Sequence, residues 1–148
     1  MTNPIKNMIS LLAVSTIMLL AFKIQSPENT LTLDISNIKD PKGAIYVQVF
    51  NATQHFPKPP YAFQTVIKPE GKTKVSVSFS NVVSGDYAVA VYQDSNNNGK
   101  FDRNFIGIPK EPYALSQNFH PKMSAPTFEE CKISVGPNKS QFNLELVN

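Results

Sequence analysis

The strongest constraint on the fold is an alternation of apolar and polar residues with a period of two, which runs through most of the chain after residue 30. In VSVSF, residues 75–79, apolar side chains alternate with serines. Successive side chains of a β-strand point to opposite faces, so this period is typical of strands with one buried face. The run YAVAVY at residues 87–92 is apolar on both faces and predicts a central strand. No useful window after residue 30 has helical periodicity.

Seven such segments are separated by residues that favour turns, which predicts an all-β fold, an antiparallel β-sandwich of about seven strands. The segments are residues 31–35, 45–50, 63–67, 75–79, 87–92, 133–135 and 142–146. The turn DPKG, residues 40–43, predicts that the first two strands form a hairpin. The prolines of FPKPPY, residues 56–61, lack the amide hydrogen of a central strand and predict a rigid crossing loop. The alternative for FPKPPY is a polyproline ligand for a partner domain.

An uninterrupted apolar run at residues 8–22 lies close to the N-terminus, between Lys6 and Lys23. A transmembrane helix needs about 20 apolar residues. The run is shorter and follows a positive charge, which is typical of a signal peptide. We therefore expect residues 1–26 to be a signal peptide or an uncleaved membrane anchor, and residues 27–148 to form one β-sandwich domain. The domain is expected to be exported, either periplasmic or secreted, with membrane contact only through an uncleaved N-terminal segment.

Composition excludes several classes of function. The 14 basic and 11 acidic residues are spread singly, so no basic patch for nucleic acid is expected. The single cysteine, Cys131, rules out an intramolecular disulfide and a Cys-rich zinc or iron–sulfur site, and a buried thiol is expected. Two histidines, His55 and His120, leave little material for a histidine metal centre. No P-loop, dinucleotide-binding or nucleophile-elbow motif occurs, so we do not expect an enzyme.

Residues 94–102, DSNNNGKFD, place carboxylate and amide side chains at alternate positions before a glycine. They match the front half of the calcium-loop pattern D-x-[DN]-x-[DN]-G. Calcium takes about six to eight oxygen ligands, and alternate side chains of a tight loop supply several of them. Gly99 can adopt a backbone conformation that other residues resist, which lets the chain wrap an ion. The expected Ca²⁺ ligands are the side chains of Asp94, Asn96, Asn98 and Asp102 and the carbonyl of Lys100.

The loop differs from an EF-hand. The twelfth position is Phe105 instead of glutamate, and a strand enters the loop instead of a helix. Two carboxylates predict a weak site, with a Kd of about 10⁻⁴–10⁻³ M, to which Glu111 could add a further ligand. The alternative is a polar turn without metal, because Asn and Asp side chains also bond to nearby backbone amides.

Three motifs occur together between residues 85 and 118. They are Gly-x-Tyr-Ala-Val at 85–89, Asp-x-Asn-x-Asn-Gly-x-x-Asp at 94–102 and Gly-Ile-Pro-x-Glu at 107–111. With these motifs, and APTFE at 125–129, the chain resembles the bacterial family catalogued as domain of unknown function 2141 over about residues 31–147. The resemblance implies an exported bacterial protein with a small β-sandwich, similar to Ig-like or prealbumin-like modules. It implies no activity.

GIPKEPY, residues 107–113, has two interpretations. Lys110, Glu111 and Tyr113 could form a binding surface for a glycan or a peptide. Alternatively, Ile108 and Tyr113 could anchor the long loop in the end of the sandwich, as loops of this length need apolar anchors.

The leading functional hypothesis is a non-catalytic module of the bacterial cell envelope, in which the calcium-type loop orders a binding or structural surface. Its partner would be an unknown protein or glycan. One alternative is an envelope enzyme that acts on a sugar or peptide through residues 102–120, with Asp102, Glu111 or His120 as catalytic groups; Ser116 with Glu111 and His120 could be drawn as a triad. The other alternative is a plain structural domain without metal.

Overall fold

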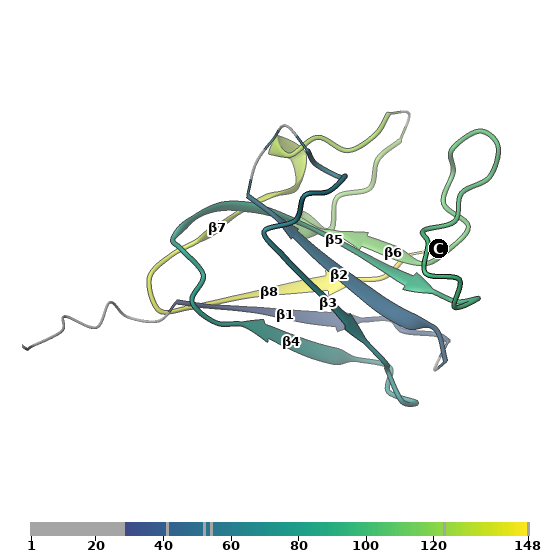
Figure 1. The fold of residues 1–148 in the computed structure, drawn as a ribbon, viewed down its shortest axis with the longest axis horizontal. Coiled ribbons are helices and arrows are strands. Elements are labelled where there is room, and N and C mark those ends of the chain that lie inside the picture. Colours follow the sequence, from purple (N-terminus) through teal and green to yellow (C-terminus); the bar gives the residue numbers. More distant parts are fainter. Residues whose placement is uncertain (1–28, 41, 52, 54, 123, 148) are drawn as a thin grey trace, which may run out of the picture.

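A computed structural model describes residues 29–147, except 41, 52, 54 and 123. The expected signal segment, residues 1–26, lies outside this part of the chain. In the described part, two sheets pack face to face as an all-β sandwich, which confirms the predicted fold class (Figure 1). No helix within these residues is long and apolar enough to cross a membrane.

The smaller sheet has the strand order β4-β1-β8. Its strands are β1 (Thr30–Ser36), β4 (Val75–Phe79) and β8 (Lys139–Glu145). β1 pairs with β4 in the expected antiparallel sense. β1 and β8, however, pair in parallel, from Thr30 beside Lys139 to Ser36 beside Glu145. The first and last strands therefore lie side by side, and the sandwich is not wholly antiparallel as predicted.

The larger sheet has the path β3-β2-β5-β6, with β7 also paired to β5. Its strands are β2 (Ala44–Phe50), β3 (Phe63–Ile67), β5 (Gly85–Asp94), β6 (Tyr113–Leu115) and β7 (Lys132–Val135). β5 pairs with β2 on one side and with β7 and then β6 on the other, so the prediction of a central strand at residues 87–92 is confirmed. β6 was not predicted, because three residues are too few to show an alternation.

Two predicted connections are wrong. β1 and β2 form no hairpin, because they belong to different sheets, and residues 37–43 link the two layers. The turn itself is present: the Lys42 amide donates to Asp40 Oδ1 at 2.8 Å. A turn signature specifies a reversal of the chain and leaves open which strands then pair. FPKPPY joins β2 to β3, which are neighbours in one sheet, so it is a long hairpin connection and not a crossing loop.

Two apolar clusters lie on opposite faces of the larger sheet. The main core fills the space between the sheets and is mostly aliphatic, with Leu33, Val47 and Val89 fully buried. The second cluster lies on the outer face, where Phe50 and Ala88 are covered by Phe128 and other side chains of the long loops. Successive side chains of a strand point to opposite faces, and the outward-facing Phe50 and Ala88 are apolar, so this part of the outer face is apolar as well.

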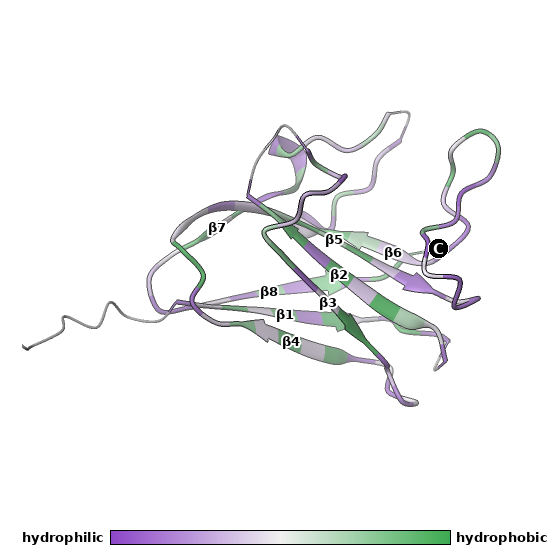
Figure 2. Cartoon of the chain, viewed as in Figure 1, coloured by the Kyte–Doolittle hydropathy of each residue, from purple (hydrophilic) through white to green (hydrophobic). Residues whose placement is uncertain are grey.

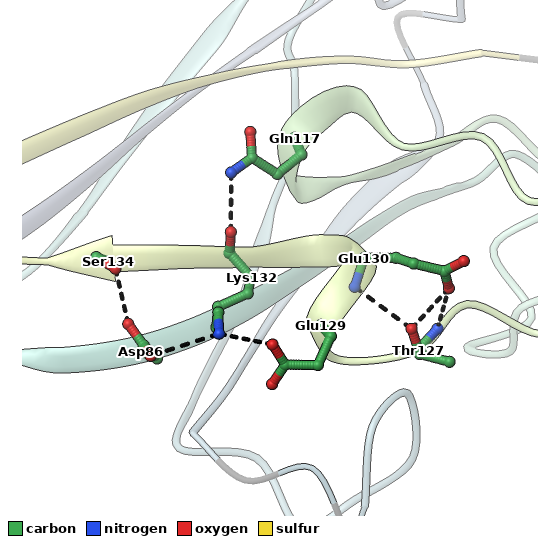
Figure 3. Close-up of polar contacts among 7 residues, drawn as sticks. All are labelled: Asp86, Gln117, Thr127, Glu129, Glu130, Lys132 and Ser134. Atoms are coloured by element: carbon green, nitrogen blue, oxygen red, sulfur yellow. Dashed lines mark hydrogen bonds and ion pairs between the residues drawn. The ribbon is translucent and has the colours of Figure 1, made fainter.

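The segment after β6 is held against β5 by a network of polar contacts (Figure 3). Lys132 Nζ lies 2.6 Å from a carboxylate oxygen of Glu129 and 3.9 Å from Asp86 of β5. Ser134 Oγ donates to Asp86 at 2.7 Å, and Gln117 Nε2 donates to the Lys132 carbonyl at 2.8 Å. The network fixes the start of β7 and with it the loop that covers the outer face.

Thr127 and Glu130 close the turn that leads into this segment. One Glu130 carboxylate oxygen accepts the amide and the hydroxyl of Thr127, at 2.8 and 2.7 Å (Figure 3). These hydrogen bonds lower the pKa of Glu130. The turn brings Phe128 onto the outer face, where it is 7% exposed.

Candidate functional site: a groove on the outer face of the larger sheet

The outer face of the larger sheet is only partly covered, and a groove remains open on it. Its volume is about 860 Å³. The outer face of β2, β5 and β6 contributes to its floor, and loop residues from 57–61, 99–109 and 121–126 form its walls. We call this feature the groove. Small-molecule sites are typically concave regions of about 300–1,000 Å³ with an apolar lining and a few polar groups, and the groove falls in that range.

A row of tyrosines crosses three strands of the larger sheet, and two of them, Tyr92 and Tyr113, line the groove. The register places Tyr46 of β2 beside Tyr92 of β5, and Tyr92 beside Tyr113 of β6. The Tyr46 and Tyr92 rings are stacked, with centroids 4.7 Å apart and planes at 3°. Phe101, from the following loop, lies 5.1 Å from the Tyr92 ring and 6.2 Å from the Tyr113 ring. Strand register thus turns three distant tyrosines into one aromatic surface.

The polar groups around the groove are amides and cations. Gln48 on the floor donates its Nε2 hydrogen to the Tyr61 hydroxyl at 3.1 Å. Arg103 lies over the Phe101 ring, 5.0 Å from its centroid, which is a cation–π arrangement. Lys100 and Lys122 also line the groove, and its described lining contains no Asp or Glu. The groove therefore combines aromatic rings with positive charge.

Residues 94–102, which we call the acidic loop, follow β5 at one end of the groove. Asp94 is 1% exposed, and its Oδ1 and Oδ2 accept the amides of Asn98 at 3.1 Å and Gly99 at 2.7 Å. Gly99 has a positive φ of 77°, as predicted for a wrapping glycine. The Nδ2 groups of Asn96 and Asn98 both donate to Asp102 Oδ2, at 2.7 and 2.9 Å.

These contacts bear on whether the acidic loop suits Ca²⁺. The side chains of Asn96, Asn98 and Asp102 converge on one point. The Oδ1 atoms of Asn96 and Asn98 accept the amides of Asn98 and Lys100 at 3.1 and 2.8 Å, so each side chain would give up a backbone hydrogen bond to turn its oxygen towards an ion. Asp94 uses one lone pair on each oxygen for the backbone and keeps others. Hard oxygen donors are what Ca²⁺ prefers, so the donor set fits it. Among the described residues, no group of three or more His, Cys, Asp or Glu is close enough to hold a metal without amide ligands.

Glu111 fixes both ends of the acidic loop. Its Oε1 accepts the Ser95 amide and its Oε2 accepts the Asp102 amide, each at 3.0 Å. The residue is 5% exposed, which places it inside the loop's hydrogen-bond network and not on the exposed binding surface where the sequence put it. The carboxylate links the first and last parts of the loop, and so holds the loop at the end of the groove.

Residues 103–109 form a short hairpin, which we call the finger, that projects from the end of the sandwich (Figure 1). Its base is the β-bridge between Arg103 and Pro109. Asn104 orders its turn: the side-chain Oδ1 accepts the amides of Ile106 at 3.1 Å and Ile108 at 2.8 Å. Ile106 and Ile108 line the groove on one side and are still 65% and 54% exposed. Ile108 therefore does not anchor the loop in the sandwich, as one interpretation of GIPKEPY expected.

The other residues singled out from the sequence lie apart. Tyr113 lines the groove, and Lys110 is exposed beside the finger. Ser116 is buried; its hydroxyl accepts the Val89 amide at 2.8 Å and donates to the Cys131 carbonyl. His120 is exposed, and no hydrogen bond joins it to Ser116 or Glu111 in the described part of the chain. The structure therefore gives Ser116 a structural contact between backbone segments.

Burial changes the acidity of two groups near this face. It raises the pKa of Tyr92 to about 12, with smaller contributions from Tyr46 and Asp94. It also raises the pKa of the Cys131 thiol to about 12, with Glu130 adding to the effect. Cys131 is fully buried in the outer cluster, which confirms the predicted buried thiol. Both side chains therefore stay neutral at physiological pH.

Sequence reasoning missed most of the groove residues. The groove residues Gln48, Tyr61 and Tyr92, and the neighbouring Tyr46, were assigned only to strands or to a proline-rich loop. The available signal was that the outward positions of residues 46–50 and 88–92 hold no charged residue and are aromatic or apolar except for Gln48. That pattern indicates a face that is covered or used, but it does not say which strands lie together.

The comparisons with known proteins give one match. A family model described as an uncharacterized protein conserved in bacteria (DUF2141) matches residues 33–143. No curated protein and no solved structure matches the chain. The matched residues include both sheets, the acidic loop and the finger, so the groove lies within the family's shared region.

Proposed function

The chain belongs to the DUF2141 family of bacterial proteins, and we propose that it is a non-catalytic binding module whose groove holds an acidic glycan of the cell envelope. The observation that carries the proposal is the groove itself, whose described lining holds aromatic rings and cations and no carboxylate. Aromatic rings pack against the apolar faces of sugar rings, and arginine pairs with carboxylate or phosphate groups on them.

A glycan suits the groove better than an extended peptide does. Peptides that bind sheets commonly add a strand to an exposed edge through main-chain hydrogen bonds. The base of the groove is the face of β2, β5 and β6, where the backbone groups already pair with one another. Recognition there depends on side chains. The half-buried Phe101 and Tyr113 line the groove, and the buried Tyr92 ring beside them holds them in fixed positions.

Within this proposal, the acidic loop binds Ca²⁺ and stiffens one end of the groove. The ligands would be Asp94, Asn96, Asn98, Asp102 and the Lys100 carbonyl, with Glu111 holding the loop ends from outside this set. An ion that binds only the folded loop stabilises the fold by mass action. It would also keep Phe101, which lies inside the metal-ligating segment, and Arg103, which directly follows it, in place against the groove.

Binding of an oligomeric uronic acid, measured by calorimetry, tests the glycan. We expect binding to the oligouronate and at least tenfold weaker binding to a neutral oligosaccharide of equal length. Phe101→Ala and Arg103→Gln should each weaken the oligouronate at least fivefold. Lys72→Gln, which removes an exposed charge in the turn before β4, is the matched control and should leave the affinity unchanged. Equal affinities of all three variants and the parent would contradict the proposal.

A thermal melt in EDTA and in millimolar calcium tests the ion. At a concentration ten times the Kd, ligation adds about 1.4 kcal/mol, which corresponds to a rise in Tm of about 3–8 °C for a domain of this size. Asp102→Asn should abolish the rise. Asp34→Asn, on the outer face of the smaller sheet, should keep it. A Tm that is the same with and without calcium would reduce the acidic loop to a polar turn.

A further inference from the structure

Three of the five exposed large apolar side chains among the described residues lie on the finger, including the most exposed one. Phe105 is 99% exposed, and its neighbours Ile106 and Ile108 are also largely open to solvent. Figure 2 shows this apolar tip at the end of a polar stem. Burying an aromatic ring is strongly favourable, so a fully exposed phenylalanine beside two isoleucines marks a contact surface.

The tip of the finger, which carries Phe105 and Ile106, belongs to a hairpin that is held by hydrogen bonds. The β-bridge between Arg103 and Pro109 closes its base, and the Asn104 amide donates to the Ile108 carbonyl at 2.8 Å. The Asn104 side chain binds two further amides of the turn, and the Gly107 amide donates to the Asn104 carbonyl at 3.0 Å. The turn's own hydrogen bonds are therefore made within the finger, and only apolar side chains are left to face a partner.

The charges that flank the tip are positive and exposed. Arg103 and Lys110 lie at the two ends of the finger, and Lys100 precedes it, all with exposed side chains. The nearby carboxylates are turned away from the surface: Asp94 and Glu111 are buried, and Asp102 accepts two side-chain amides within the acidic loop. The exposed part of this end of the molecule thus combines an apolar tip with a collar of cations.

We propose that the finger docks on an anionic lipid surface, with Phe105 and Ile106 in the interfacial region and Lys100, Arg103 and Lys110 against the lipid phosphates. This proposal goes beyond the glycan site and does not depend on it. It also extends the expectation from the sequence, which limited membrane contact to the N-terminal segment. Amphipathic elements of this kind sit at the headgroup boundary, and cations add to their attachment to anionic lipids.

The size of the patch favours a lipid over a protein partner. A stable protein interface buries about 800 Å² on each side, with a central cluster of anchoring residues. Three side chains at the tip of a two-stranded finger cannot supply that area, since even an aromatic residue buries only about 150–250 Å². A lipid interface sets no such requirement, because it closes around a narrow projection.

Tryptophan fluorescence provides a direct test, since the chain contains no tryptophan. Phe105→Trp places one indole at the tip of the finger. In buffer its emission should be that of an exposed indole, and vesicles of phosphatidylglycerol and phosphatidylethanolamine should shift it to shorter wavelength. Phosphatidylcholine vesicles should give a smaller shift. High salt should reduce binding to the anionic vesicles, because the collar of cations is solvent-exposed.

The matched control is Val83→Trp. Val83 is 75% exposed and lies just before β5, at the opposite end of the strand from the finger. Its emission should not respond to any vesicle. In flotation assays, the parent chain should rise with anionic vesicles, and Phe105→Ser should lower the bound fraction at least fivefold with an unchanged Tm.

Three results would overturn the proposal. The first is an emission of Phe105→Trp that anionic vesicles leave unchanged. The second is an equal shift of Val83→Trp, which would mean unspecific adsorption. The third is a shift of Phe105→Trp that grows with protein concentration in the absence of vesicles, which would assign the tip to a second copy of the chain.

Discussion

The outward faces of the two sheets are built differently. On the smaller sheet, the outward side chains are polar, and several bond to each other: Thr32 and Ser78 hydroxyls lie 2.9 Å apart, and Gln141 donates to Asp34. On the larger sheet, the outward positions hold Phe50 and a row of tyrosines. The polar groups of the first face hydrogen-bond to one another. The apolar side chains of the second face are shielded from solvent by the long loops over only part of its area.

This difference locates the functional surface without any catalytic motif. A sandwich requires only the inner faces of its sheets to be apolar. An apolar outer face is an additional feature, and here it supports both a covered cluster and an open groove. The proposed glycan site and the finger lie on the same side of the molecule, and the outer face of the smaller sheet contributes to neither.

The largest expected effect comes from the covered end of the outer face. Phe50 is 1% exposed and packs edge-on against the Phe56 and Tyr61 rings, with centroids 5.0 and 5.3 Å away. Phe50→Ala should lower the free energy of unfolding by about 3–5 kcal/mol, measured by urea denaturation. Phe105→Ala, at the exposed tip of the finger, is the matched control and should change it by less than about 0.5 kcal/mol. Similar losses in both variants would contradict the division between a covered cluster and a free finger.

The next largest effect should come from the residue that holds the acidic loop. Glu111→Gln replaces one of two accepting oxygens with an amide that faces a backbone N–H. The unfolding free energy should fall by about 1–3 kcal/mol, because a buried donor loses its partner. Glu145→Gln, an exposed position at the end of β8, should have almost no effect. If Glu111→Gln is equally silent, Glu111 does not hold the loop.

A smaller effect is expected from Tyr92 on the outer face of the larger sheet, in how the free energy of unfolding changes at alkaline pH. Burial raises the pKa of Tyr92 from 10.0 to about 12 in the folded chain, so above pH 10 the unfolded chain loses this proton first. The corresponding stability is complete below pH 10 and is lost as the pH rises towards 12. Tyr92→Phe should therefore lose less stability across this range than the parent, in urea melts at each pH. Identical slopes would mean that Tyr92 titrates as an exposed tyrosine.

The smallest effect is expected on the outer face of the smaller sheet. Hydrogen bonds from Ser76 and then from Gln141 lower the pKa of Asp34 below its ordinary value of 3.8. Its contribution is present above that value and is lost as the pH falls through the folded pKa. Asp34→Asn should change the unfolding free energy near neutral pH by less than about 1 kcal/mol, measured in urea. A larger loss would show that the polar face is also a structural element.

Local alternation was sufficient to predict seven of the strands in the described residues, because a period of two is a property of each segment alone. Pairing was not predictable in the same way. DPKG at residues 40–43 indicated a turn, but the strands it joins separate into different sheets. The aromatic row could not be predicted for the same reason. Its members become neighbours only through the register of β2, β5 and β6, which pairs Tyr46 with Tyr92 and Tyr92 with Tyr113.

In the candidate site, too, only features formed by residues close in sequence could be predicted. The acidic loop was visible as a motif because its side chains are close in sequence. The role of Glu111 was not visible, since its partners Ser95 and Asp102 are defined by how the finger folds back on the loop. Phe105 counted in the sequence only as the residue that breaks the EF-hand pattern. Its exposure depends on the finger projecting away from both sheets.

The parallel pairing of β1 and β8 bears on the order in which the chain can fold. The Asn138 amide donates to Asn29 Oδ1 across 109 residues, at the start of both strands. β2 and β3 are consecutive strands and pair with each other, whereas the smaller sheet requires the two ends of the domain to meet. Contacts of such long range slow folding, because chain entropy is lost before the contact forms. Until its last strand has been synthesised, this chain can complete neither the smaller sheet nor the core beneath it.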